Sequence, residues 1–107
     1  MAAYLRRRLA DGSIAVLRRR GAAEAGAIAI KIDRLDGRVA LYGPAPQSLT
    51  VDLPIGVDRL FQRLHAEDWI DPAAAEARLG REVKFDPDLW IVEVEDRNGE
   101  PALDLAR

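Results

Sequence analysis

The chain has 107 residues, enough for one domain with a single hydrophobic core, and its 49% of hydrophobic and 32% of charged residues exclude a disordered chain. It contains no cysteine, which excludes disulfides, thiolate nucleophiles and cysteine-ligated metals. No apolar run approaches the roughly 20 residues of a membrane span, and the N-terminal stretch lacks the apolar core of a signal peptide. We therefore expect a bacterial cytoplasmic protein with one domain over residues 1–107 and no membrane partner.

The formal net charge of −2 is distributed unevenly along the chain. Residues 1–20 carry +5, residues 21–66 are neutral and residues 67–107 carry −7, which together give −2. A basic beginning and an acidic end can pair with each other, either within one molecule or between two copies. This pairing explains the arginines without a ligand.

The first elements are short. Residues 2–10 fit a helix, because Leu5 and Leu9 lie four positions apart on one face. If they form a strand instead, residues 11–12 become a hairpin turn, and both alternatives stay open. Residues 14–20 are predicted to form a strand, with Ile14 and Val16 on one of its faces.

Residues 26–46 predict the β-hairpin around which the rest packs. Asp36-Gly37 suits a two-residue type I′ turn, which would pair Leu35 with Arg38 and Ile32 with Leu41. This register places a set of apolar residues on one face of the hairpin, namely Ile28, Ile30, Ile32, Val39 and Leu41.

Prolines should end the sheet after this hairpin. Pro44 and Pro46 remove backbone donors, so we expect the strand to end at Gly43 and an ordered loop to follow. Alternating apolar residues over 49–53 predict a short edge strand. Residues 57–65 match helical spacing but are flanked by strand-like segments, so helix and strand both stay open.

The C-terminal part contains a helix and a strand. Asp71 is expected to be the N-cap of the helix and Pro72 its first residue, and Gly80 to loosen or end it. A turn is expected at residues 85–88. The strand over Leu89–Glu95 should lie next to the hairpin, with one apolar face formed by Trp90, Val92 and Val94.

The chain should then turn at residues 96–99, and residues 102–105 return as a brief strand or fray. Together the elements predict an α+β fold, a bent antiparallel sheet of four to five strands with one or two helices.

Four stretches together resemble one family of short bacterial proteins. They are residues 18–21 (RRRG), 25–27 (AGA), 41–46 (LYGPAP) and 85–96 (FDPDLWIVEVED), of which the last is the most specific. The family is domain-of-unknown-function family 1491, and the resemblance spans most of the chain. It implies a small cytoplasmic single-domain protein and brings no established activity, catalytic residue or cofactor.

Acidic residues near the C-terminus form one candidate site. Carboxylates close to one sheet edge suit a hard cation such as Mg²⁺, and the acids in question are Asp86, Asp88, Glu93, Glu95 and Asp96. Asp86-Pro87-Asp88 resembles the acidic part of a nuclease site. Such sites also place a lysine one residue beyond an acid on the following strand, whereas Glu93-Val94-Glu95 offers another acid at that position. We therefore predict no metal site and no cofactor, with Asp88 shaping a turn. His65, the only histidine, is expected to be a surface or structural residue, so no catalytic residue is predicted.

Two arginine triplets form the other candidate site. Arg6-Arg7-Arg8 and Arg18-Arg19-Arg20 can converge on a phosphate backbone if their segments lie side by side. The pI of about 5.4 argues against this, because nucleic-acid-binding domains are commonly basic.

These patterns favour a non-catalytic interaction module that binds a protein partner or itself. Its surface would be an unpaired sheet edge or the proline-containing loop. A small nucleic-acid-binding domain is the alternative, and a metal-dependent hydrolase is the third hypothesis. The candidate binding residues are Arg6, Arg7, Arg8, Arg18, Arg19, Arg20, Tyr42, Pro44, Pro46, Asp86, Asp88 and Trp90.

Overall fold

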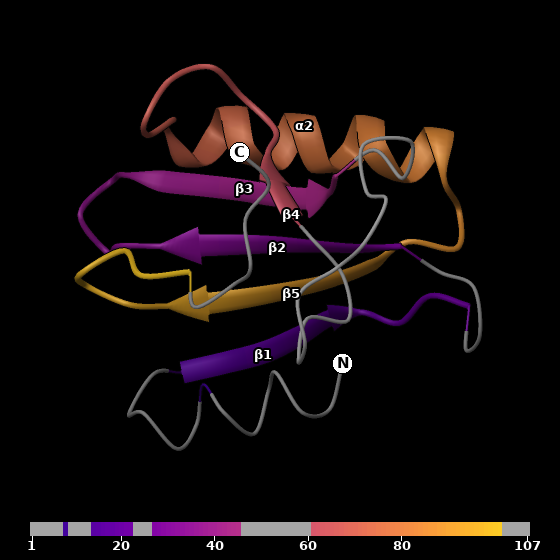
Figure 1. The fold of residues 1–107 in the computed structure, drawn as a ribbon, viewed down its shortest axis with the longest axis horizontal. Coiled ribbons are helices and arrows are strands. Elements are labelled where there is room, and N and C mark those ends of the chain that lie inside the picture. The colour runs from indigo at the N-terminus through magenta and orange to yellow at the C-terminus, as the bar shows by residue number, and fades with distance from the viewer. Residues whose placement is uncertain (1–7, 9–13, 23–26, 46–60, 102–107) are drawn as a thin grey trace, which may run out of the picture.

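The computed structural model describes residues 8, 14–22, 27–45 and 61–101. These residues form one mixed sheet and one helix, which confirms the α+β class (Figure 1). The strands are β1 (Ile14–Arg19), β2 (Ile28–Asp33), β3 (Val39–Pro44), β4 (Phe61–Arg63) and β5 (Trp90–Glu95), and the helix is α2 (Pro72–Phe85). Their order in the sheet is β1-β5-β2-β3-β4.

One strand pair makes the sheet mixed rather than purely antiparallel. β5 lies between β1 and β2, antiparallel to the first and parallel to the second. Helix α2 separates β5 from β4 in the sequence and carries the chain back, so that β5 starts at the same end of the sheet as β2. A helical connection of this kind is what parallel strands require.

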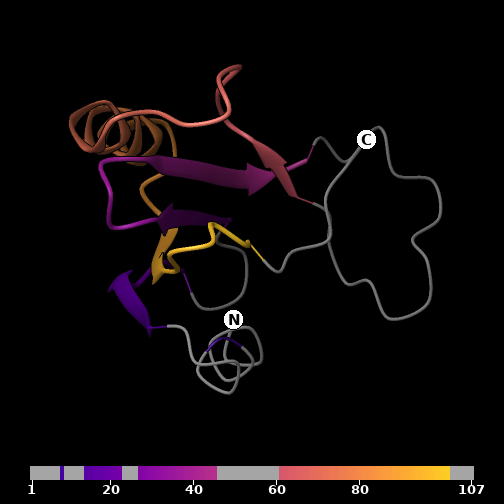
Figure 2. The ribbon, with the colours of Figure 1, turned by 90° about the vertical axis from the view of Figure 1, so that its left-hand side faces the viewer.

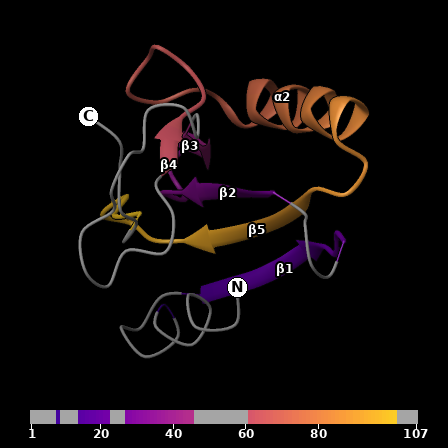
Figure 3. The same ribbon diagram turned by 45° about the vertical axis from the view of Figure 1, so that its right-hand side comes forward.

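The helix covers only part of one face of the sheet. α2 packs on β3, at the side of the sheet away from β1 (Figures 1 and 3). Viewed from the side, α2 and β1 lie at opposite ends of the described fold (Figure 2). The buried residues between helix and sheet are Ala29, Val39, Leu41, Ala75, Leu79, Leu89 and Ile91.

The other face of the sheet carries a second buried cluster. Its members come from four strands, and they are Ile28, Ile30, Ile32, Ala40, Tyr42, Phe61, Val92 and Val94. Trp90 packs against them at the rim. The predicted apolar face of the last strand and its place beside the hairpin are therefore confirmed.

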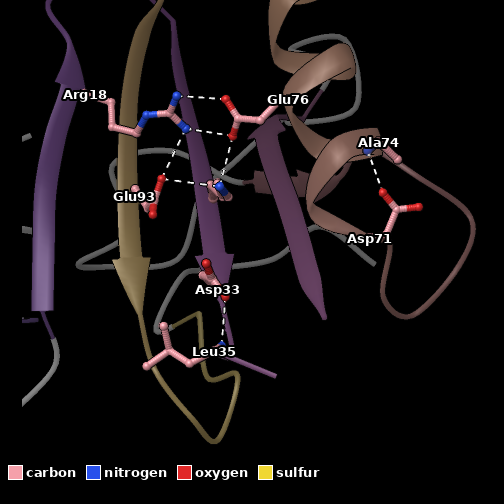
Figure 4. Close-up of polar contacts among 8 residues, drawn as sticks. Arg18, Asp33, Leu35, Asp71, Ala74, Glu76 and Glu93 are labelled. Carbon is pink, nitrogen blue, oxygen red and sulfur yellow. Dashed lines mark hydrogen bonds and ion pairs between the residues drawn. The ribbon is translucent and has the colours of Figure 1, made fainter. Parts of the chain in front are cut away.

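The predicted hairpin exists, but its register was wrong by one residue. Ile32 pairs with Ala40 and not with Leu41, because the loop between the strands has five residues. Leu35 and Gly37 both adopt positive φ, at 67° and 85°. Leu35 N–H donates to the Asp33 carboxylate at 2.8 Å, which stabilises this wider loop (Figure 4).

The shift separates the apolar residues that were predicted to share a face. Since paired residues point to the same side of a sheet, Val39 and Leu41 lie under the helix, whereas Ile28, Ile30 and Ile32 lie on the opposite face. Both sets are buried. The apolar pattern was therefore compatible with either register.

Helix α2 begins as the sequence predicts and ends later. Asp71 accepts a hydrogen bond from Ala74 N–H at 2.8 Å, and Pro72 is the first helical residue (Figure 4). The prediction that Gly80 ends or loosens the helix was wrong, since α2 continues to Phe85. A helical glycine costs about 1 kcal/mol relative to alanine, and burial of Leu79 outweighs this cost.

The remaining predictions divide between confirmed and undescribed segments. The strand at 14–20 and the turns at 85–88 and 96–99 are confirmed, and Phe61–Arg63 forms a strand. β3 ends at Pro44, one residue later than expected. The helix at 2–10 apart from Arg8, the edge strand at 49–53, residues 57–60 and the strand at 102–105 lie outside the described residues. Among the described residues, no helix is long and apolar enough to span a membrane.

Candidate interaction surface along strand β1

Strand β1 lies at one end of the sheet and exposes apolar side chains. Within the described part of the chain, β5 is the strand that pairs with β1, and no strand pairs with its outer side. Ile14, Val16 and Leu17 are 57%, 51% and 36% exposed. The other two exposed large apolar residues of the described structure, Leu35 and Phe85, lie at the β2–β3 loop and at the end of α2.

The hydrogen bonds of β5 tell which backbone groups face β1. Trp90 N–H donates to the carbonyl of Ala27, and Asp96 N–H donates to the carbonyl of Asp33. Even-numbered positions of β5 therefore direct their backbone groups toward β2. Because these groups alternate sides along a strand, odd-numbered positions direct theirs toward β1.

The same alternation identifies the unpaired groups of β1. Ile14 and Val16 are opposite Glu95 and Glu93, so their backbone groups point to β5. The N–H and C=O groups of Ala15 and Leu17 consequently point away from the sheet. We call residues 14–17, with these outward groups and the exposed apolar side chains, the β1 edge.

A β-bulge follows the β1 edge and turns Arg18 toward the helix. Leu17 is opposite Val92 while Arg19 is opposite Ile91, so Arg18 is the extra residue. Its guanidinium reaches across β5 and donates two hydrogen bonds of 2.8 Å to the carboxylate of Glu76 on α2 (Figure 4).

Arg18 belongs to a network of four charged residues on the helix side of the sheet. Arg18 Nη1 also donates to Glu93 at 3.1 Å. Lys31 Nζ donates to Glu76 at 2.9 Å and lies 3.4 Å from Glu93, so two bases face two acids. The network links β1, β5, β2 and α2.

The network shifts the pKa values of its members. The hydrogen bond from Arg18 lowers the pKa of Glu76 to about 2, against the opposing effect of burial. The same hydrogen bond raises the pKa of Arg18. Burial by itself lowers the pKa of Lys31, but the hydrogen bond to Glu76 and the nearby carboxylate of Glu93 outweigh it and raise this pKa overall. All three groups are therefore held in their charged forms.

The other described arginines of the candidate phosphate site also contact the protein itself. Arg19 donates to the carbonyl of Leu89 at 2.6 Å, and the Arg20 guanidinium lies 5.9 Å from the centre of the Trp90 ring. Arg8 is buried, with 1% exposure, and donates to Asp96 at 2.6 Å. The two triplets therefore do not converge in their described members, while Arg6 and Arg7 lie outside the described residues.

The start of β5 joins three of the stretches that carry the family resemblance. Ala22 N–H donates to the carbonyl of Asp88 at 3.0 Å, and Trp90 Nε1–H donates back to the carbonyl of Ala22 at 2.7 Å. A Cβ on Gly21 would lie 1.9 Å from the Asp88 carbonyl oxygen. Ala27 accepts from Trp90 N–H. These contacts hold the three stretches together, and the Trp90 indole N–H is used in one of them.

The acids that were considered as a candidate cation site are not brought together. Asp86 caps the end of α2 and accepts from Asp88 N–H, so Asp86 and not Asp88 shapes this turn by its side chain. Glu95 lies at the other end of β5, about 17 Å from Trp90 along an extended strand, and Asp96 follows it. Among the described residues, no group of three or more acids and histidine is suited to hold a metal ion.

Tyr42 and His65 make contacts within the fold, whereas the proline loop is described only up to Ala45. Tyr42 is buried on β3, which raises its pKa, and Pro44 is exposed at the end of β3. Pro46 lies outside the described residues. His65 Nε2 accepts from Leu41 N–H at 3.0 Å, and its Nδ1 lies 2.8 Å from the Glu67 carbonyl.

Comparison with known proteins decides the family. A family model described as "Protein of unknown function (DUF1491)" matches residues 1–104. The chain belongs to the DUF1491 family. No curated protein matches it in sequence.

Solved structures of DUF1491 proteins are similar to this chain. A crystal structure of a family member from Caulobacter crescentus CB15 shares 28% identity and a TM-score of 0.75, covering 99% of this chain and 91% of its own. A solution structure of a protein from A. tumefaciens shares 39% identity and a TM-score of 0.79, covering 98% and 88%. An NMR structure of a DUF1491 family protein from Caulobacter crescentus CB15 has a TM-score of 0.77 at 28% identity, covering 99% of this chain and 91% of its own.

Proposed function

We propose that this protein is a non-catalytic interaction module that binds an extended polypeptide along the β1 edge. The observation that carries the proposal is the coincidence of unpaired backbone groups and exposed apolar side chains on one strand. Three of the five exposed large apolar side chains of the described structure belong to this strand. A strand added to a sheet edge gains hydrogen bonds from such groups and specificity from the side chains.

The charged residues around the β1 edge support binding of a polypeptide over binding of a nucleic acid. The guanidinium of Arg18 is already paired with Glu76 and Glu93, and breaking these pairs opposes transfer to a phosphate. A basic strip that releases counterions from phosphates is the usual source of nucleic-acid affinity. We assign the module to the bacterial cytoplasm as part of the proposal, and the similar proteins from Caulobacter crescentus and A. tumefaciens support a bacterial source.

Affinity capture with paired variants tests the proposed function. Tagged wild-type protein, Val16→Lys and Phe85→Lys are used on the same lysate, and captured proteins are purified and titrated by calorimetry. Val16→Lys adds a charge to the β1 edge, whereas Phe85→Lys removes an 88% exposed apolar side chain from the end of α2. We expect a directly binding protein that is lost with Val16→Lys and retained with Phe85→Lys. Equal binding to all three proteins would refute the role of β1.

A further inference from the structure

The outward backbone groups of the β1 edge are self-complementary. Ala15 and Leu17 carry the outward backbone groups, and Val16 lies midway between them. When two such strands approach in antiparallel orientation, outward residues must meet outward residues to exchange hydrogen bonds. A two-fold axis at Val16 satisfies this condition, because it places Ala15 of each copy opposite Leu17 of the other.

We propose that the β1 edges of two copies of this chain pair antiparallel about a two-fold axis at Val16 and join the two sheets. The inference rests on the proposed function, and it names a second copy as the bound polypeptide. Val16 meets Val16 of the second copy on the helix side of the sheet, while Leu17 meets Ala15 of the second copy on the other side. Val16 and Leu17 are thereby covered by apolar side chains of the second copy.

The charges agree with this arrangement. Ile14 lies opposite Arg18 of the second copy, whose aliphatic stem covers the isoleucine side chain. Next to Ile14, on the same face, is Glu95 of β5, which makes no ion pair with the described residues. The arginine-rich end of each β1 therefore approaches an acid of the other copy, and no like charges meet at the axis.

Neighbouring registers pair fewer residues of Ile14–Arg18 with each other. An axis at Ala15 would place Leu17 opposite residue 13, which precedes β1. An axis at Leu17 would place Arg18 opposite Val16 and disrupt the apolar centre. Only the axis at Val16 gives every residue of Ile14–Arg18 a partner inside the same stretch of the second copy.

Single cysteines test this register, because the chain contains none of its own. Across a non-hydrogen-bonded antiparallel pair the two Cα atoms are about 4.5 Å apart, within the range of about 4.4–6.8 Å that disulfides span. Val16→Cys should therefore cross-link with itself under oxidised glutathione. Ile14→Cys is the matched control, since it is similarly exposed, but its two copies would lie about 14 Å apart along the strands.

We expect Val16→Cys to give about tenfold more disulfide dimer than Ile14→Cys and Ala15→Cys at millimolar protein concentration. Sedimentation equilibrium should show that the wild type dimerises and that Val16→Lys, with an unchanged thermal melt, does not. Equal cross-linking of Ile14→Cys, preferential cross-linking of Ala15→Cys, or a monomeric wild type would overturn the proposal. If the wild type stays monomeric while the capture experiment yields a β1-dependent partner, the self-pairing fails and the proposed function stands.

Discussion

Replacing Glu76 by glutamine should lower the stability at neutral pH and leave it little changed in acid. A carboxyl pKa lowered from 4.5 to about 2 corresponds to about 3 kcal/mol in a fully buried site. The Glu76 side chain is 44% exposed, and screening by solvent reduces the contribution to about 1 kcal/mol. We therefore expect Glu76→Gln to lower the free energy of unfolding by about 1 kcal/mol at pH 7.

The pH dependence follows from the direction of the shift. A lowered pKa stabilises the fold fully above the unfolded-state value, and the contribution is lost as the pH falls from about 4.5 toward about 2. Urea unfolding of wild type and Glu76→Gln should thus give a difference that falls by more than half between about pH 7 and about pH 3.

Glu67→Gln is the matched control for this measurement. Glu67 is exposed and has no ion pair among the described residues, so its replacement should change the free energy of unfolding little at either pH. A Glu76→Gln difference that is absent at pH 7, or equally large at both pH values, would refute the role assigned to the network.

Three further predictions concern the contacts at the start of β5, at His65 and at the arginines. Gly21→Ala should destabilise the protein by about 2 kcal/mol or more, because the added Cβ collides with the Asp88 carbonyl. Gly80→Ala has open space around its Cβ and should stabilise the protein by about 1 kcal/mol in thermal melts. Equal effects of the two changes would contradict the packing. Nitrogen NMR at mildly alkaline pH should find the imidazole of His65 protonated on Nδ1, since Nε2 accepts from Leu41 N–H, and a proton on Nε2 would contradict this bond. Labelled RNA and DNA should show no binding in anisotropy titrations at low salt, and a salt-dependent affinity that vanishes on replacing the arginines at 18–20 would favour the nucleic-acid alternative.

The elements that could be predicted from the sequence are those whose neighbouring residues allow only one secondary structure. Asp71-Pro72 specifies a helix start, and the alternation of Trp90, Val92 and Val94 specifies a strand with one apolar face. In both places a capping group or a period of two decides the structure without help from distant residues. The fold class followed from these elements.

The register of the hairpin lay beyond such local reasoning. Asp36-Gly37 is typical of a two-residue turn, but Leu35 adopts positive φ and widens the loop. The one-residue shift moves Val39 and Leu41 to the other face of the sheet. If only one face of the sheet were buried, this shift would expose them, and the apolar pattern would have excluded it. Here both faces are buried, so the apolar pattern did not discriminate.

The candidate site was predicted only in outline. An unpaired edge and pairing of arginines with acids were both foreseen, but neither β1 as that edge nor Glu76 as the partner of Arg18 was. The bulge at Arg18 and the position of α2 decide these contacts, and both depend on tertiary packing. The available signal was that Glu76 is a single acid that follows three alanines in the predicted helix, and it was not used.

Amide hydrogen exchange along β1, resolved by NMR, tests the central claim most directly. In dilute protein, the amides of Ile14 and Val16 should exchange slowly because they are bonded to β5, while those of Ala15 and Leu17 exchange fast. Raising the concentration, or adding a bound partner, should protect Ala15 and Leu17. Slow exchange of both amides already in dilute monomer, or fast exchange in the complex, would contradict the claim that β1 offers an open edge for pairing.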